Sequence, residues 1–517
     1  YSTIMKYTGT LLIVSILCIA GQTSSVYADY SLSKIFKSKV KKREPLWFDV
    51  LSNGRKEREK KQEIQQIEST LNQTVIQDIA QQRTQVGDIQ CLSQPQLNPN
   101  EQLSLIHAVE RAVCRFPETK SAWVQTRIQA AQLKISKSSY YPQLSTSVNY
   151  DWGRDDYQVD GRPDMSYDTD TRRYGLAVQA NWLLYDFGAR HYQVEEAQKL
   201  LAMSLAQQDV VLQSVIIKTI SAYYQITQVE LKLDNLKQLV TLAEQNHQIA
   251  NARYKAGAGI KSDVLQMSAN LAKAKSDQTK LMGELKIAKG QLASLMGEPA
   301  YQNFQINNQL KIPKALNLKS IEDLVKQAEK LHPRFKAAQL GIDAAQDKVK
   351  ATQRAKYPSL TFNSSYNQSK QLGESPFGNE TQRLQAGVQV NFPLFDGFNR
   401  KHQVVVAQEN LKLKQLEEEQ LKLEINAEIW KSYNELHAIH DNIQALQLLN
   451  ESATQAYAVA QGRYRAGVGN MLEVVNAQNL LTEAKMNYST VLTEFLVVRY
   501  QLLSNMGNLN IWSESQS

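Results

Sequence analysis

Two stretches of the sequence, 252-ARYKAGAGIKSDVLQ-266 and 462-GRYRAGVGNMLEVVN-476, are near copies of each other, 210 residues apart. In each, a long segment without proline or glycine ends at an Ala-Gly-x-Gly break, and a second helical segment follows. Glycines at the end of a helix adopt positive φ at little cost and let the chain reverse. The pattern therefore predicts two helical corners in one chain, and it indicates an internal repeat.

The repeat extends well beyond the corners. Pro117 and Pro333 are 216 residues apart, whereas the motifs AVQANWLLYDFG and GVQVNFPLFDGF, which begin at 177 and 387, are 210 apart. The first copy thus holds an insertion before the motif, and insertions fall in exposed loops. We predict a first repeat over 101–300 and a second over 301–517.

Each repeat contains two segments in which apolar and polar residues alternate. In 144-LSTSVNYDW-152 the apolar residues occupy every second position for most of the length, which is the period of a strand with one apolar face. The pattern predicts β-hairpins at about 143–184 and 359–394, with strands of about ten residues. The stretch 154–171 between the first two strands is polar and turn-rich, and it is expected to be a loop.

Long helices follow the two hairpins. The segments 189–256 and 398–461 contain neither proline nor glycine, and their apolar residues recur at intervals of three and four. The sequence predicts a helix from Asp186 to about Ala252 and another from Phe398 to Gln461, each roughly 100 Å long. Such helices pack side by side as coiled-coil neighbours. The corners at 253–260 and 463–470 then connect them to return helices.

The N-terminal part has a different character. Residues 1–28 are expected to be a secretory signal peptide that starts at Met5 and is cleaved after Ala28. A basic extension, 29–100, follows, in which Lys34–Lys61 holds eleven basic and four acidic residues. Because this run accounts for most of the net charge of +8, the rest of the chain lacks the basic face of a nucleic-acid-binding protein, and no nucleic-acid partner is expected.

Two cysteines remain after removal of the signal peptide. An exported protein is exposed to an oxidising periplasm, so a disulfide between Cys91 and Cys114 is expected. The alternative is a pair of buried free thiols.

Four strands of this length match the outer membrane. They alternate, they carry aromatic residues near their ends, and about ten residues cross a bilayer when tilted. No membrane-spanning helix is expected. Four strands cannot close into a barrel around their side chains, so three protomers would supply twelve. The alternative is a periplasmic coiled-coil scaffold without a pore.

These features together resemble the TolC-like outer-membrane efflux family. The resemblance rests on the tandem repeat, on the Tyr-Pro pairs at 141 and 357, and on the Leu-Tyr-Asp-Phe-Gly and Leu-Phe-Asp-Gly motifs before the long helices. The Arg-Tyr-x-Ala-Gly-x-Gly corners complete it, and together the motifs cover residues 101–508.

The resemblance implies the fold class and the function. The fold would be mainly α with a β-barrel part: a homotrimer with a twelve-stranded barrel in outer-membrane lipid and a barrel of long helices in the periplasm. It would lie in the outer membrane of a Gram-negative bacterium. It would dock onto a periplasmic adaptor (membrane fusion protein) and an inner-membrane ABC or proton-driven transporter, and it would export drugs or proteins by efflux or type I secretion.

The resemblance also assigns roles at the corners. Residues expected to be exposed at the periplasmic tips, where the adaptor docks, are Arg253, Tyr254, Gly257, Gly259, Arg463, Tyr464, Gly467 and Gly469. Residues expected to form the entrance constriction are Glu473, Asn476, Asp263 and Tyr464, with a hydrogen bond from Tyr464 to Asp263 between protomers. The alternative for Glu473 is a solvated carboxylate in the first turn of a helix.

No catalytic constellation is apparent in the sequence. His437 and His440 are three residues apart on a predicted helix, but no cysteine or paired carboxylates accompany them, so no metal is expected. The glycines at 257 and 259 follow a helix rather than a strand, which is the wrong context for a nucleotide-binding loop. The sequence therefore predicts a passive duct that is not an enzyme and needs no cofactor.

Overall fold

The computed structural model describes residues 102–307, 310, 320–372, 380–507 and 509. All of them belong to one compact unit, Arg83–Ser517. The predicted signal peptide, the basic extension to residue 100, and Cys91 lie outside the described residues. The predicted boundaries of these segments therefore remain predictions.

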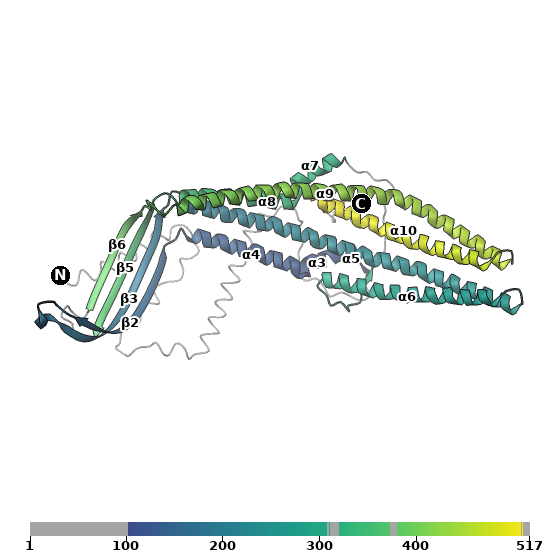
Figure 1. Cartoon of the computed structure of the whole chain (residues 1–517), viewed down its shortest axis with the longest axis horizontal. Helices are drawn as coiled ribbons and strands as arrows, with labels where there is room; N and C mark the ends of the chain where they lie inside the picture. The colour runs from purple at the N-terminus through teal and green to yellow at the C-terminus, as the bar shows by residue number, and fades with distance from the viewer. Residues whose placement is uncertain (1–101, 308–309, 311–319, 373–379, 508, 510–517) are drawn as a thin grey trace. The chain divides into compact units, whose positions relative to one another are not determined.

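The described chain contains the same succession of elements twice (Figure 1). The first copy consists of α3 (Leu105–Arg115), α4 (Pro117–Ser138), β2 (Gln143–Tyr157), β3 (Tyr167–Tyr185), α5 (Ala189–Lys255) and α6 (Lys261–Leu295). The second consists of α7 (Ile321–Leu331), α8 (Pro333–Arg354), β5 (Ser359–Leu372), β6 (Glu380–Asn391), α9 (Asn399–Arg465) and α10 (Met471–Asn505). A short parallel pair, β1 (Gln102–Leu103) and β4 (Gln305–Ile306), and a 3-10 turn, η3 (Pro163–Met165), complete the structure.

Proline sets the first break in each copy. Phe116 and His332, which precede Pro117 and Pro333, are extended because proline disfavours the α conformation in the residue before it. Each proline then takes the first position of the next helix, where its missing N–H is not needed. The two prolines at equivalent positions of the repeats therefore begin equivalent helices.

The four long strands form one antiparallel sheet in the order β2-β3-β5-β6. The hairpins predicted at 143–184 and 359–394 are present, and the first holds the expected loop, but this loop spans 158–166 rather than the whole polar stretch 154–171. The β2–β3 ladder continues to the pair Tyr157 and Tyr167, whose rings stack with centroids 5.5 Å apart. Arg154 and Asp168 form an ion pair on the same extension. Backbone pairing and these contacts maintain the strands where the sequence has no apolar alternation.

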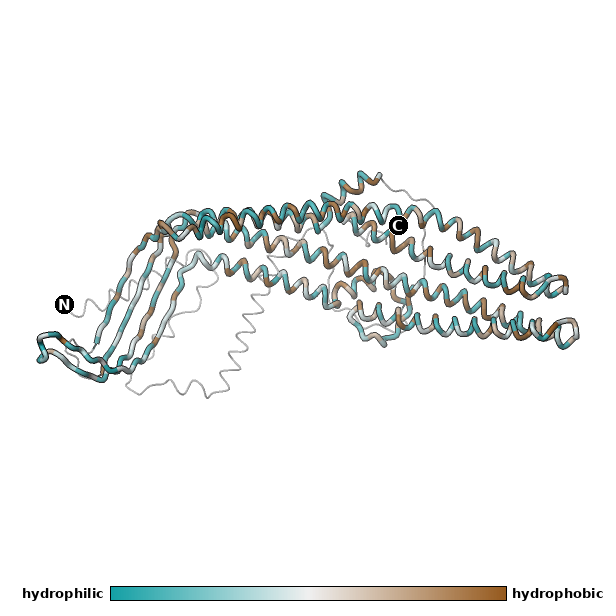
Figure 2. Tube along the Cα trace, viewed as in Figure 1, coloured by the Kyte–Doolittle hydropathy of each residue, from teal (hydrophilic) through white to brown (hydrophobic). Residues whose placement is uncertain are grey.

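The sheet has one apolar and one polar face, because each ladder pairs residues of like character. Val148 lies opposite Leu176, and Phe362 lies opposite Val388. The apolar side chains are not covered by the rest of the protomer: Val148 is 80% exposed. Hydrophobic and hydrophilic residues are interspersed along the strands and the helices (Figure 2).

The two long helices are confirmed, and each has 67 residues. They end at Lys255 and Arg465, a few residues later than predicted. Next to the strands, α5 packs against α4 and α8; towards the corners it packs against α6 and α10. One 18-residue window of α5 is apolar enough to cross a membrane by composition. That window lies in a helix packed among other helices, so its composition does not by itself define a membrane span.

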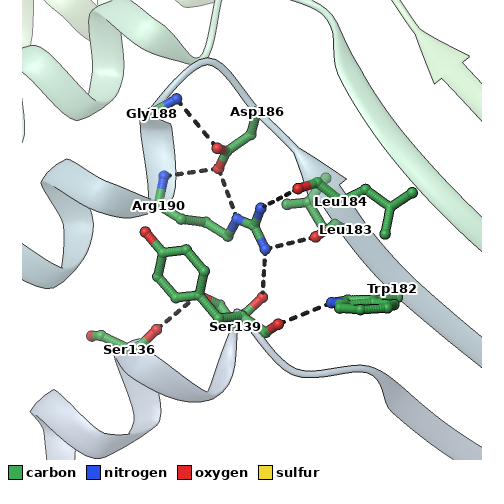
Figure 3. Close-up of polar contacts among 9 residues, drawn as sticks. Ser136, Ser139, Trp182, Leu183, Leu184, Asp186, Gly188 and Arg190 are labelled. Atoms are coloured by element: carbon green, nitrogen blue, oxygen red, sulfur yellow. Dashed lines mark hydrogen bonds and ion pairs between the residues drawn. The ribbon is translucent and has the colours of Figure 1, made fainter. Parts of the chain in front are cut away.

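The chain passes from strand to helix around a buried arginine (Figure 3). The Arg190 guanidinium donates to three carbonyl oxygens, those of Ser139, Leu183 and Leu184, at 2.7 to 3.2 Å. Asp186 Oδ2 accepts from the Arg190 backbone N–H at 2.8 Å and from its Nε at 3.0 Å. These bonds satisfy the backbone where the ladder ends, and the Asp-Phe-Gly motif supplies the left-handed residues of the turn, with φ of 54° at 187 and 91° at 188.

The second repeat has a looser form of this junction, which provides a control. The side chain of Arg190 is 8% exposed and that of Arg400, bonded to Asp396 at 2.7 Å, is 21% exposed. Substitution Arg190→Met should lower the free energy of unfolding by about 3 kcal/mol, because it removes the ion-pair partner of the buried Asp186 carboxylate and the donor to three carbonyl oxygens. Arg400→Met should cost about 1 kcal/mol. Denaturant unfolding in detergent measures both, and equal losses would contradict this account.

A buried histidine predicts acid sensitivity of the helical region. His332 is 5% exposed, and its Nδ1 accepts from the backbone N–H of Arg334 at 3.1 Å at the start of α8. Burial, assisted by the Arg334 charge, lowers its pKa to about 4. The unfolded chain therefore binds a proton more readily below about pH 6.5, and stability should fall by up to about 3 kcal/mol as pH drops from there to 4.

Substitution His332→Asn tests this effect, because asparagine keeps an acceptor at this capping position and does not titrate. We expect the variant to show a flatter profile of stability against pH between 6.5 and 4. The exposed His107, on α3, serves as control: His107→Asn should leave the slope unchanged. An unaltered slope in His332→Asn would show that another group causes the acid sensitivity.

Candidate functional site

The two glycine corners have the same backbone. Gly257 has φ of 72° and Gly467 has φ of 80°, the left-handed conformation that ends a helix. In the first corner the N–H of Ala258 donates to the Arg253 carbonyl at 2.9 Å, and that of Gly257 donates to the Tyr254 carbonyl at 3.1 Å. The second corner repeats both bonds at 3.0 and 3.1 Å. The corners therefore satisfy their final carbonyls before the return helices begin.

The second glycine of each corner is required by space. A Cβ on Gly259 would lie 3.1 Å from the backbone nitrogen of Tyr254, and one on Gly469 would lie 2.9 Å from the Cβ of Arg463. The chain folds back too closely on its own helix for a side chain. In the Ala-Gly-x-Gly motif the first glycine thus provides the left-handed residue, and the second allows the chain to approach its own helix closely.

Arg253 connects the two corners of one protomer. Its guanidinium lies over the ring of Tyr464, 4.7 Å from the centroid, and Nη1 donates to the Tyr464 carbonyl. Its Nη2 donates to the Ala258 carbonyl of its own corner at 3.2 Å. The residue predicted to be an exposed docking residue is thus half-buried, and it bridges the α5 and α9 ends.

Tyr464 corrects two predictions. It is 4% exposed, not exposed at the tip, and its hydroxyl donates to Asp263 Oδ2 at 3.2 Å within one protomer, not between protomers. The reason is that α5 packs against α10, which brings the two helical hairpins together. Burial and the neighbouring Asp263 raise the pKa of Tyr464 to about 12, so the hydroxyl remains a donor at neutral pH.

The second corner also has a helix cap that the first lacks. Asn470 Oδ1 accepts from the backbone N–H of Glu473 at 2.8 Å, whereas Ile260 gives α6 no side-chain cap. Glu473 Oε1 lies 3.5 Å from Arg463 Nε, and both side chains are about half exposed. The cap was missed in the sequence, although Asn-x-x-Glu before an apolar helix is a signal for it.

The exposed part of the tips combines apolar and cationic side chains. Tyr254 and Arg463 are exposed as expected, Asn476 of the predicted constriction is also exposed, and large hydrophobic residues accompany them at the two corners. The exposed fractions are 44% for Tyr254, 63% for Ile260, 71% for Val468 and 67% for Leu472. The corners therefore present uncovered apolar side chains among the exposed cations Lys255, Lys261, Arg463 and Arg465.

A buried polar cluster stabilises the contact between hairpins above the corners. Asn246 of α5, 2% exposed, donates to Tyr457 Oη at 2.8 Å and to Gln478 Oε1 at 3.2 Å. Gln461 Nε2 in turn donates to Asn246 Oδ1 at 2.8 Å. Because every bond joins α5 to α9 or α10, the cluster fixes the register of the two hairpins, and sequence reasoning did not find it.

The described residues contain no group of three or more His, Cys, Asp or Glu side chains that could hold a metal ion. His437 packs against Tyr433, with ring centroids 4.7 Å apart, and His440 packs against Phe495 at 6.1 Å. Cys114 on α3 takes part in a disulfide. Its predicted partner, Cys91, is not among the described residues, so the pairing remains a prediction.

Comparison with known proteins identifies this architecture. The profile of the outer membrane efflux protein family matches residues 108–298 and 324–508. The chain belongs to the outer membrane efflux protein family. Like the rest of the family, this outer membrane efflux protein is an outer-membrane export channel that extends into the periplasm. Family membership decides against the alternative of a scaffold without a pore.

Individual relatives agree with the family assignment. The chain is 25% identical to protein CyaE of Bordetella pertussis over 409 residues, 79% of this chain and 85% of CyaE. It is 22% identical to the outer membrane efflux protein BepC of Brucella suis over 422 residues, 78% of this chain and 86% of BepC. The MtrE outer membrane channel of Neisseria gonorrhoeae has the same fold, with a TM-score of 0.64 at 18% identity, covering 83% of this chain and 95% of MtrE.

The two corners of this efflux protein allow a matched test of the Tyr464 bond. Tyr464→Phe removes the hydroxyl that donates to Asp263 and should destabilise the corners by about 1 kcal/mol. Hydrogen exchange of the amides around 257–263 and 464–470 should speed up about fivefold, the equivalent of that free energy. Tyr254→Phe, at the corresponding and exposed position of the first corner, should leave exchange unchanged. Equal effects in the two variants would contradict the proposed link.

Proposed function

We propose that the protein acts as a homotrimeric duct that receives cargo at its corners from a periplasmic adaptor and an inner-membrane transporter. The observation that carries the proposal is that the protomer is open at both sides. Among the described residues the sheet ends in two edge strands, β2 and β6, each paired on one side, and the helical layer ends in two helices with exposed apolar stripes.

The open strands require partners in a membrane. An edge strand presents N–H and C=O groups that lipid cannot satisfy, and each unsatisfied group costs several kcal/mol. Four strands are too few to close on themselves, since about eight form the smallest filled barrel. Pairing β6 of one protomer with β2 of the next removes every edge, and three copies supply twelve strands.

The helices at the edges carry matching apolar surfaces. Next to the strands, the packing order is α4-α5-α8-α9, so α4 and α9 are outermost. The exposed large apolar residues of α4 are Val124, Ile128 and Ile135, and those of α9 over this region include Val406, Leu413, Leu416, Leu423 and Trp430. Successive α9 residues of this set lie seven, three, seven and seven positions apart, which matches the heptad period of a coiled-coil seam. They support packing of α9 on the α4 of a neighbouring protomer.

The corners are the surface that we assign to the adaptor. They lie at the opposite end of the protomer from the strands (Figure 1). A trimer offers six of them, and their exposed apolar residues give a docking partner surface to bury. The partner transporter would be of the ABC or the proton-driven class, and cargo would leave by type I secretion or efflux accordingly.

The entrance would be narrowed by the return helix of the second corner. Glu473 and Asn476 occupy its first turns, and Tyr464 with Asp263 holds that corner against the first. A ring of three Glu473 carboxylates would favour cations at this end.

Single-channel recording in a planar bilayer tests the duct. We expect discrete conductance steps from the purified protein and a larger conductance, with weaker cation preference, from Glu473→Ala. The proposal fails if neither the wild type nor Glu473→Ala conducts.

A substitution in the proposed contact between α9 and the α4 of a neighbouring protomer, the seam of the trimer, tests the oligomeric state. Leu423→Glu places a charge on the α9 stripe at a side chain that is 72% exposed in the protomer. It should shift the detergent-solubilised protein from trimer to monomer in light-scattering measurements, because burying the unpaired charge costs several kcal/mol. Gln415→Glu adds the same charge to the same helix outside the stripe and should remain trimeric. A fully trimeric Leu423→Glu variant would exclude this seam.

A further inference from the structure

The polar face of the sheet would line the barrel lumen if the proposed trimer forms. The apolar side chains point to one side throughout the ladders, and in outer-membrane barrels that side meets lipid. A hollow on the opposite side is lined by Gln179, Asn363, Gln385 and Gln389. The lumen-facing residues can therefore be read directly from the register.

This lumen face is built almost entirely from neutral groups. Over 143–151, 173–181, 361–371 and 381–391, every second residue belongs to it. Its uncharged members are Gln143, Ser145, Ser147, Asn149, Gly175, Ala177, Gln179, Asn181, Thr361, Asn363, Ser365, Asn367, Ser369, Gln371, Thr381, Gln385, Gly387, Gln389 and Asn391. The charged members over these segments are Asp151, Arg173 and Arg383.

The three charges do not cancel. Asp151 lies directly opposite Arg173 in the β2–β3 ladder, so these two offset each other. Arg383 lies opposite Asn367, and its neighbours on the same face of β6 are Thr381 and Gln385. Across the open edge, β2 of a neighbouring protomer would bring only Asp151 as a carboxylate from residues 143–151. Within these four segments each protomer therefore has one positive charge in excess, and Asp155, the next carboxylate at the same register parity, lies on the β2–β3 extension beyond Trp152.

We propose that Arg383 is a specificity-determining residue of the channel, and that three copies form a cationic ring in the barrel. The proposal rests on the trimeric duct proposed above. A ring of charge in a narrow passage with low-dielectric walls concentrates ions of the opposite sign. Arg383 would thus favour anions, and anionic groups of a cargo, near the exit, whereas Glu473 favours cations at the entrance.

Reversal potentials of the purified trimer in planar bilayers, under a KCl gradient, test the ring. Screening is weak at about 0.01 M salt, where the Debye length is about 30 Å, so the dilute side should be near that concentration. Arg383→Gln should lower the anion-to-cation permeability ratio by about twofold. Arg383→Lys keeps the charge and should restore the wild-type ratio.

Two controls separate the ring from a general effect of charge. Lys370→Gln removes the same charge from the same sheet, but Lys370 lies on the outward face, opposite Glu380 and Tyr174, and the ratio should not change. The double variant Asp151→Asn with Arg173→Gln removes an offsetting pair and should also leave the ratio unchanged.

The outcomes are distinguishable. The charge proposal is overturned if Arg383→Gln conducts as a trimer with an unchanged ratio, or if Lys370→Gln shifts the ratio equally. Absence of conductance from every protein, including the wild type, would overturn the duct itself and the ring with it.

Discussion

Every backbone amide and carbonyl that meets lipid must find a partner inside the protein, and this constraint governs the molecule. In the part of the chain that the structure describes, the sheet satisfies its two inner strands and leaves β2 and β6 without a partner strand at their outer edges. The end of the ladder poses the same problem where strands become helices. There Arg190 supplies three hydrogen bonds to carbonyls that no strand can reach. Strand pairing between protomers and the Arg190 contacts at the strand–helix junction thus both supply hydrogen bonds to backbone groups that would otherwise lack them.

The internal duplication lets the protein assign different tasks to equivalent positions. Both corners use the same backbone bonds, but only the second has an asparagine cap and a buried tyrosine. Arg253 of the first corner extends to Tyr464 of the second, while the corresponding Arg463 lies beside Glu473. The first corner therefore braces the second through Arg253 and Asp263, whereas Glu473 of the second corner lies beside Arg463 of its own corner. Two repeats with identical corners could not form this asymmetric contact between the two helical hairpins.

The elements of the fold could be predicted from the sequence because their signals are local. Proline pairs marked the helix starts, long segments without proline or glycine marked the helices, and alternation marked the strands. The extension of β2 and β3 to Tyr157 and Tyr167 was missed because its residues are polar, and only cross-strand pairing reveals it. The burial of Tyr464 was missed because it depends on α5 packing against α10, a contact between residues about 200 positions apart.

The extended β2–β3 hairpin continues past the apolar band of the sheet. Beyond Trp152 its outward face changes to arginine and aspartate, which lipid does not accommodate, so the ribbon continues into water on the side away from the helices. In the cell that side is the exterior. The polar stretch is therefore a paired ribbon down to Tyr157 and Tyr167 with a short loop at its end, and on intact bacteria it is a part of the described chain that antibodies or phages can reach.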